Sequence, residues 1–338
     1  MYERGGDMKL SVGSISAYPS NLSVCCLESK NITYACVVHK TQIHIVNWDN
    51  KNENVSWDSI NILDTSTDKP VDALQAAIVF PNIRTFPLLV VGTTTDAQIF
   101  DIQTQKLLHQ ESIDKEMSVG DRQELFVEQF LSWNNLERQF HLSSIADMAT
   151  CRYDKVTCSC DCSGTIIVWN KCFKGVQLKM ATQHPITAVN VLHKQVIVGT
   201  LRGRVLFFSI STGELIAEIF AHARSVTCVS VAPEAGYVLS GSEDGRFIVY
   251  KLHMMKAQTF QVSIKPNIHS LIVFSSHKGN LQYSRTTDIY VEYLYCDELP
   301  NCGIMGAQFT NSRGSNIAVA CFDRNVLYGY HMVRNTAA

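Results

Sequence analysis

The chain has 338 residues, 46% of them hydrophobic and 18% charged, and its net charge is −2. This is an ordinary globular composition with enough length for one large domain, and it provides no bulk positive field for nucleic acid. No run of about 18 apolar residues occurs, so no membrane span is expected.

The first ten residues, MYERGGDMKL, contain no continuous apolar stretch, so we expect no secretory signal. A protein without such a signal stays in a reducing compartment, and its twelve cysteines are then expected to be thiols. The sequence therefore predicts a cytoplasmic protein.

Short apolar or β-branched runs, separated by Gly, Pro, Asn and Asp, recur along most of the chain and indicate antiparallel strands. The equivalent aromatic residues Trp169, Phe208 and Tyr250 are about 40 residues apart, the usual length of a four-stranded propeller blade. We therefore expect an all-β fold, with residues 1–338 forming a single β-propeller domain.

The N-terminal segment 8–16 contains a short alternating patch, LSV, beside Lys9. It is predicted to be a closing strand that completes the last blade and so leaves no free sheet edge. Residues 21–64 and 71–110 then each contain three or four strand-like runs, and they are predicted to be the first two blades.

Residues 111–140 break the repeat. They are charged at their start, and apolar residues then recur at helical spacing, which predicts a helical insert with a helix near 121–133. Two alternatives remain open for this helix: it packs on the flank of the propeller, or it docks a partner.

The repeat resumes at residues 141–180 and 184–219. In the first of these blades, the turn before the third strand has Ser163 where a carboxylate is expected, so a three-membered polar network is predicted. In the second, Val198 and Arg202 replace the expected serine and aspartate, so this blade is predicted to depend on apolar packing.

Residues 221–252 form the clearest unit, with three strand-like runs and the hairpin signal Asp244-Gly245. Buried Ser, His and Asp side chains must be paired, so His222, Ser240 and Asp244 are predicted to form a hydrogen-bonded network that fixes the strand register. No G-x-S-x-G surrounds Ser240, which argues against a nucleophilic serine and leaves no catalytic residue to assign.

Residues 253–300 leave two alternatives open: a seventh blade, or a long loop within the preceding blade. Residues 303–332 supply three strands and lack a fourth, which the N-terminal segment would provide. The expected architecture is most simply a seven-bladed ring, with six blades as the alternative.

The unit 221–252 resembles a WD repeat. That family has a His before the first strand, a Ser or Thr ending the second, an Asp in the tight turn and a Trp on the third. The matching positions are His222, Ser240, Asp244 and Tyr250, and in the earlier blade they are His141, Ser159 and Trp169.

One WD-repeat protein is matched more closely, along residues 20–39, 212–245 and 302–323. This resemblance implies a non-enzymatic, intracellular interaction protein, with vesicles or cytoskeletal and ciliary assemblies as its candidate settings. It names no partner.

The cysteines do not predict a metal site. Cys158, Cys160 and Cys162 alternate along one strand, whereas zinc sites commonly use C-x-x-C pairs, so buried thiols are the preferred interpretation. The phosphate-binding glycine loops and H-E-x-x-H are also missing, and Lys and Arg are not clustered with aromatic residues. No cofactor, metal or nucleic-acid partner is expected.

Surface recognition is the remaining function. Arg202, Arg224, Arg246 and His184 lie in turns and loops at strand ends, and they form a candidate partner-binding face that suits acidic or phosphorylated protein segments. The sequence thus predicts a scaffold for protein–protein interactions. The alternatives are a structural subunit of a large cytoskeletal or ciliary assembly and, less favoured, an enzyme on a propeller scaffold.

Overall fold

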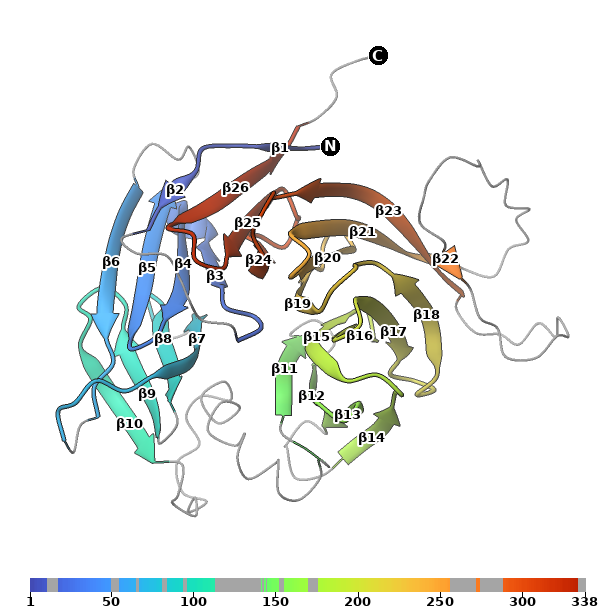
Figure 1. Cartoon of the computed structure of the whole chain (residues 1–338), viewed down its shortest axis with the longest axis horizontal. Helices are drawn as coiled ribbons and strands as arrows, with labels where there is room; N and C mark the ends of the chain where they lie inside the picture. Colours follow the sequence, from blue (N-terminus) through green and yellow to red (C-terminus); the bar gives the residue numbers. More distant parts are fainter. Residues whose placement is uncertain are drawn as a thin grey trace, which may run out of the picture.

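The computed structural model describes residues 1–10, 18–49, 55–64, 67–80, 84–93, 96–112, 141, 143, 145–151, 155–169, 176–255, 272–273 and 288–333. In this part of the chain, the strands form six antiparallel sheets that surround a common axis as the blades of a propeller (Figure 1). The same residues contain one 3₁₀ turn, Glu28–Lys30, and no α-helix.

The first three blades each have four strands in chain order. Blade 1 consists of β3 (Ser23–Leu27), β4 (Ile32–His39), β5 (Gln42–Asp49) and β6 (Val55–Asn61). Blade 2 consists of β7 (Ala73–Val79), β8 (Leu88–Thr93), β9 (Asp96–Asp101) and β10 (Leu107–Ser112). Blade 3 consists of β11 (Ile145–Cys151), β12 (Val156–Asp161), β13 (Thr165–Trp169) and β14 (Val176–Ala181).

The last three blades take strands from more distant segments. Blade 4 consists of β15 (Ile186–Leu192), β16 (Gln195–Thr200), β17 (Arg204–Ser209) and β18 (Leu215–Phe220), and β22 (Ile272–Val273) pairs with its outer edge. Blade 5 consists of β19 (Val226–Ala232), β20 (Tyr237–Ser242), β21 (Arg246–Met255) and β23 (Asp288–Glu298). Blade 6 consists of β24 (Ile304–Phe309), β25 (Asn316–Cys321) and β26 (Val326–Met332), joined by β1 (Tyr2–Arg4) and β2 (Met8–Lys9).

Burial falls from the inner strands of a blade to its outer edge. Every residue of β12 and of β16 is buried, whereas β6 and β14 are exposed along most of their length. The second strand of a blade is covered by a neighbouring blade on each face, which explains why these strands are nearly continuous apolar runs. The outer strands face solvent and carry more polar residues.

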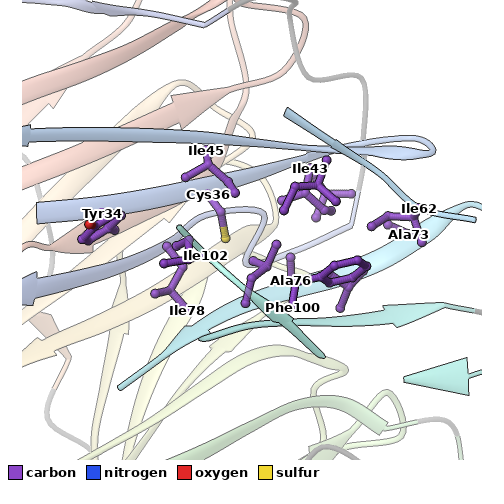
Figure 2. Close-up of a cluster of buried hydrophobic side chains, with 14 of the residues drawn as sticks. Tyr34, Cys36, Ile43, Ile45, Ile62, Ala73, Ala76, Ile78, Phe100 and Ile102 are labelled. Atoms are coloured by element: carbon purple, nitrogen blue, oxygen red, sulfur yellow. The ribbon is translucent and has the colours of Figure 1, made fainter. Parts of the chain in front are cut away.

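The hydrophobic core lies between the blades. Figure 2 shows one cluster, in which Cys36 and Ile43 of blade 1 meet Ile78 and Phe100 of blade 2. Equivalent clusters join blades 3 to 4, 4 to 5, 5 to 6 and 6 to 1. Blades 2 and 3 instead have separate clusters, and the intervening residues 113–140 lie outside the described part of the chain.

The two ends of the chain meet in blade 6. Tyr2 pairs with Met332 and Met8 pairs with Leu327, so the N-terminal residues run antiparallel to β26 as an outer strand (Figure 1). The pairing involves Tyr2–Arg4 and Met8–Lys9 rather than one continuous strand over 8–16, and residues 11–17 lie outside the described part. This strand covers the edge that the C-terminal strands would otherwise expose.

The expectation of seven blades is wrong, and the six-bladed alternative describes the structure. The segment DIYVEYLYC belongs to β23, which pairs with β21 from Arg246↔Glu298 to Met255↔Asp288. The described strands of this region therefore join two neighbouring blades, β23 in blade 5 and β22 at the edge of blade 4, and they do not form a blade of their own. The predicted helical insert at 111–140, with its helix near 121–133, falls almost wholly on residues outside the described part.

Candidate functional site

A chain of four hydrogen-bonded side chains crosses blade 3. Trp169 Nε1 donates to Ser159 Oγ at 2.9 Å, and Ser159 Oγ lies 2.7 Å from His141 Nε2. His141 Nδ1 lies 3.0 Å from Asp161 Oδ2. Because an indole only donates and a carboxylate only accepts, each proton points toward Asp161, which fixes the histidine tautomer with hydrogen on Nδ1.

Asp161 is a member of this network that the sequence interpretation missed. The three-membered network expected from Ser163 is wrong, because the carboxylate comes from the end of β12, two residues before the turn position. Asp161 Oδ1 also accepts hydrogen bonds from the backbone N–H groups of Ser163 and Thr165, each at 2.9 Å. The sequence does contain a signal for this role, because an Asp side chain in a turn commonly accepts a hydrogen bond from the backbone N–H two residues later.

Blade 5 holds the equivalent chain with its aspartate in the turn. His222 Nε2 lies 2.9 Å from Ser240 Oγ, and His222 Nδ1 lies 3.3 Å from each carboxylate oxygen of Asp244. The backbone N–H groups of Ala223 and Arg246 donate to the same carboxylate, both at 2.9 Å. Asp244 thus ties the loop before β19 to the turn before β21.

The electrostatics of Asp244 follow from these contacts. Burial would raise the pKa of its carboxyl group, but the hydrogen bond and charge of His222, with the two backbone N–H groups, lower it to about 2. Tyr250 replaces the tryptophan of the family, and its buried hydroxyl forms no hydrogen bond of ordinary geometry. Tyr250 thus lies beside Ser240 without the well-aligned hydrogen bond that Trp169 makes in blade 3.

Blade 4 has a histidine without the rest of the network. Val198 is fully buried where a serine would stand, and the closest ion-pair contact of His184 is at 3.9 Å, from Nε2 to Glu218. Burial, together with the charge of Arg204, lowers the pKa of His184. A neutral imidazole is consistent with the absence of a carboxylate within hydrogen-bonding distance of this ring among the described residues.

One feature is common to blades 3, 4 and 5. The turn between the second and third strands ends in a glycine with positive φ: Gly164 at +100°, Gly203 at +75° and Gly245 at +82°. A Cβ at Gly203 would lie 2.1 Å from the carbonyl oxygen of His222, and at Gly164 it would lie 2.4 Å from that of Thr182. Because it has no Cβ, each glycine allows the turn to pack directly against the backbone of the loop that leads into the next blade.

These turns and the loops between blades lie at the same end of the sheets, which we call the junction face. Gly203 accepts the backbone N–H of His222, which brings Arg202 of blade 4 close to Arg224 in the loop entering blade 5. Both arginines are exposed and form no ion pair within the described residues. Arg246 differs, because its guanidinium pairs with Glu298 at 2.8 Å.

The buried networks have no catalytic access. Ser159, His141 and Asp161 are connected as in a hydrolase triad, but Ser159 is 0% exposed and its Oγ is bonded to the indole of Trp169. Burial raises the pKa of the Cys158 and Cys160 thiols. Among the described residues, no cluster of three or more His, Cys, Asp or Glu is arranged to hold a metal, and no helix is long and apolar enough to cross a membrane.

Comparison with known proteins supports the same family. The family model described as WDR54 matches residues 131–266. WD repeat-containing protein 54 is 27% identical to this chain in Mus musculus and 26% identical in Homo sapiens, in each case over 195 residues. These matches cover 54% of this chain and 48% of each relative, so the chain spans about half the length of the curated relatives it matches.

Solved structures show the same fold. A chain from the crystal structure of a mitotic checkpoint complex aligns with a TM-score of 0.65 over 98% of this chain and 92% of its own length, at 13% sequence identity. A ring of antiparallel blades with His–Ser–Asp networks and glycine turns is typical of the WD-repeat β-propeller, and the matches support that family for this chain. Within the family it resembles WD repeat-containing protein 54.

Proposed function

We propose that this chain is a scaffold that binds protein partners through the junction face of blades 4 and 5. WD-repeat propellers are generally non-enzymatic interaction modules, which supports the proposal at the level of the family. The main observation in support is a patch on the junction face at blade 4, where exposed apolar side chains lie beside arginines that form no ion pair. We call it the blade 4 patch; its members are Leu201, Arg202, Arg204, Phe220 and Arg224.

The composition of the blade 4 patch is that of an interface. Leu201 is 54% exposed and Phe220 is 48% exposed, and the guanidinium carbon of Arg204 lies 4.5 Å above the Phe220 ring. Stacking against an arginine holds this ring in place before a partner arrives. Aromatic and arginine side chains are enriched among residues that dominate binding energy at interfaces.

The charge of the blade 4 patch indicates which class of partner it binds. Glu218 neutralises Arg204, but Arg202 and Arg224 have no acidic partner within the described residues. Their guanidinium groups suit carboxylates or phosphorylated side chains, which accept two parallel hydrogen bonds. The proposed partner segment is therefore acidic or phosphorylated and carries an apolar residue for Leu201 and Phe220. The proposal includes a cytoplasmic location, with vesicles and cilia as candidate settings.

Proximity labelling in cells tests the proposal with three versions of the full chain. The wild type is compared with Arg202→Ala plus Arg224→Ala, and with the control Lys106→Ala plus Arg313→Ala, which removes two exposed charges from turns at the opposite ends of the blades. Loss of two interface arginines is expected to reduce labelling of direct partners about tenfold or more. Equal labelling by both double variants would contradict the proposal.

A structural role in a large assembly is the second candidate, and the flank of the ring supports it. Val55 and Trp57 on β6 are 41% and 60% exposed, and Leu107 and Leu108 on the neighbouring β10 are 37% and 45% exposed. A relative, echinoderm microtubule-associated protein-like 3 of Mus musculus, is 26% identical over 158 residues, which are 46% of this chain and 17% of that protein. Co-purification at fixed stoichiometry in high salt, lost in Trp57→Ser, would favour this role.

A further inference from the structure

The axis of the ring contains a cavity of about 220 Å³. Residues from the first strand of every blade line it, and most of their polar groups are neutral hydroxyls and amides, such as Gln75 and Asn190. Asp147, on β11, is the one charged residue among the described lining residues. At roughly 30 Å³ per water, the cavity holds about seven waters, or one ligand of side-chain size.

Side chains of the first strands also join neighbouring blades. Five of them, Ser23, Asp147, Asn190, Ser230 and Gln308, each form a hydrogen bond with the backbone of the next blade. Asp147 Oδ2 accepts the N–H of Val189 at 2.9 Å. Ser23 Oγ and Ser230 Oγ accept the N–H groups of Ile78 and Phe309, which lie two positions further along the first strand than the equivalent of Val189, at 2.9 and 3.1 Å. Four of these five bridges are therefore made by neutral side chains, whereas Asp147 uses a carboxylate.

The carboxylate of Asp147 is costly to bury, and the other four bridges are made without a charged group. Asp147 is 8% exposed, and burial raises its pKa to about 7 although the N–H groups of Val189 and Met148 lower it. Its oxygens accept these two N–H groups at 2.9 and 2.8 Å, and the Ser20 side chain is a third donor. A carboxylate has about four acceptor positions, so it can accept another donor from the cavity.

The surroundings of Asp147 leave its charge unbalanced. The titratable groups packed near it are the thiols of Cys158 and Cys160 on β12 and Cys228 on β19. Burial raises the pKa of each of them, for Cys228 to about 11, so all three stay neutral near pH 7. Among the described residues, no basic side chain lines the cavity.

We propose that the central cavity binds a small organic cation whose ammonium or guanidinium group pairs with Asp147. Neutral hydroxyl and amide groups around the wall accept or donate the remaining hydrogen bonds of the ligand, and apolar residues such as Ala76 and Val229 contact its carbon chain. The cation is either a free amine or a lysine or arginine side chain of a partner. This site is separate from the blade 4 patch, so either proposal can fail alone.

Thermal unfolding of the full chain tests the site with two cationic probes. The first is n-butylammonium, compared with n-butanol at matched ionic strength, and the second is a tripeptide with a central lysine and blocked ends. At tenfold excess over the dissociation constant, a bound cation is expected to raise the unfolding temperature by about 1–3 °C. A shift with butylammonium indicates a free amine ligand, and a shift with the peptide alone indicates a side chain.

The variant that isolates the charge is Asp147→Asn, because the amide has nearly the same size and keeps an oxygen that can accept the N–H of Val189. It is expected to abolish the cation-dependent shift, and Asp147→Ser provides a second neutral variant. In the wild type, the shift should decrease from pH 8 to pH 6 as the carboxyl group becomes protonated. An equal shift in Asp147→Asn, an equal shift with butanol, a flat pH profile, or no shift with either cation would overturn the proposal.

Discussion

Blades 3 and 4 are adjacent copies of one unit, yet only blade 3 is held by a polar network. In blade 3, Trp169, Ser159, His141 and Asp161 form a continuous buried chain. In blade 4, the position of the serine is Val198, which is fully buried. Both blades nevertheless have four strands and the same glycine turn, so the network is not what makes a blade fold.

The second strand of each blade shows where its stability comes from. In blade 4, β16 contains the apolar run Val196–Val198, and all three side chains are 0% exposed. In blade 3, the equivalent residues of β12 are Thr157, Cys158 and Ser159, which bury less apolar area. Each fully buried Val or Ile contributes about 1.5–3 kcal/mol, so replacing such residues with small polar ones requires another source of stability. Hydrogen bonds to a buried carboxylate supply it.

The largest expected effect concerns the element that both blades share. Gly203→Ala places a Cβ 2.1 Å from the His222 carbonyl oxygen and 2.7 Å from that of Arg224, at φ +75°. Backbone atoms cannot move aside cheaply, and a left-handed alanine is strained, so unfolding free energy should fall by about 4 kcal/mol. Urea denaturation measures this change.

Two further glycines sharpen that test. Gly245→Ala should cost less than Gly203→Ala, because its nearest backbone contacts are at 2.8 Å. Gly6→Ala is the control, since no atom lies within 4 Å of its Cβ position. If alanine at Gly203 and at Gly6 lowered the unfolding free energy equally, the turn would not be in close backbone contact with the next loop.

The second prediction breaks the network in blades 3 and 5 separately. Asp161→Ala removes a carboxylate that is 0% exposed and leaves His141 and two backbone N–H groups unpaired, at a cost of about 3 kcal/mol. Asp244→Ala should cost less, roughly 1–3 kcal/mol, because its side chain is partly open to water. Thermal melting of both variants provides the comparison, and an unchanged melting temperature for Asp161→Ala would contradict the structural role of this chain.

The blade repeat could be predicted from the sequence because its signals are local. Strand runs, the Asp244-Gly245 turn and the histidines before the first strands of blades 3, 4 and 5 are signals that each lie within a unit of about 40 residues. Asp161 was missed because the family pattern places its aspartate in the turn, whereas the carboxylate of Asp161 reaches the same histidine from the strand end.

The number of blades depended on a pairing that is not local. β21 and β23 are separated by residues 256–287, so nothing in the local sequence indicates that DIYVEYLYC completes blade 5. The cavity charge at Asp147 was equally hidden, because its significance depends on residues of six blades meeting on one axis. Sequence periodicity identifies the units of a ring, whereas closure of the ring decides which side chains share its centre.

The smallest expected effect is the pH dependence that the carboxylate of Asp244 gives to blade 5; in blade 4 the equivalent turn residue is Arg202. Asp244 has a pKa of about 2 in the folded chain, below the value of about 3.9 for an unfolded aspartate. Between these values the unfolded state binds more protons, so the stabilisation by Asp244 is complete above about pH 5 and is lost as the pH falls toward 2. Asp244→Asn should therefore differ from the wild type by about 1 kcal/mol near neutral pH, after allowance for solvent screening, and converge with it in acid. Urea midpoints between pH 3 and 6 measure this, and a difference that stays constant over that range would mean that the carboxylate of Asp244 acts through its shape and not through its charge.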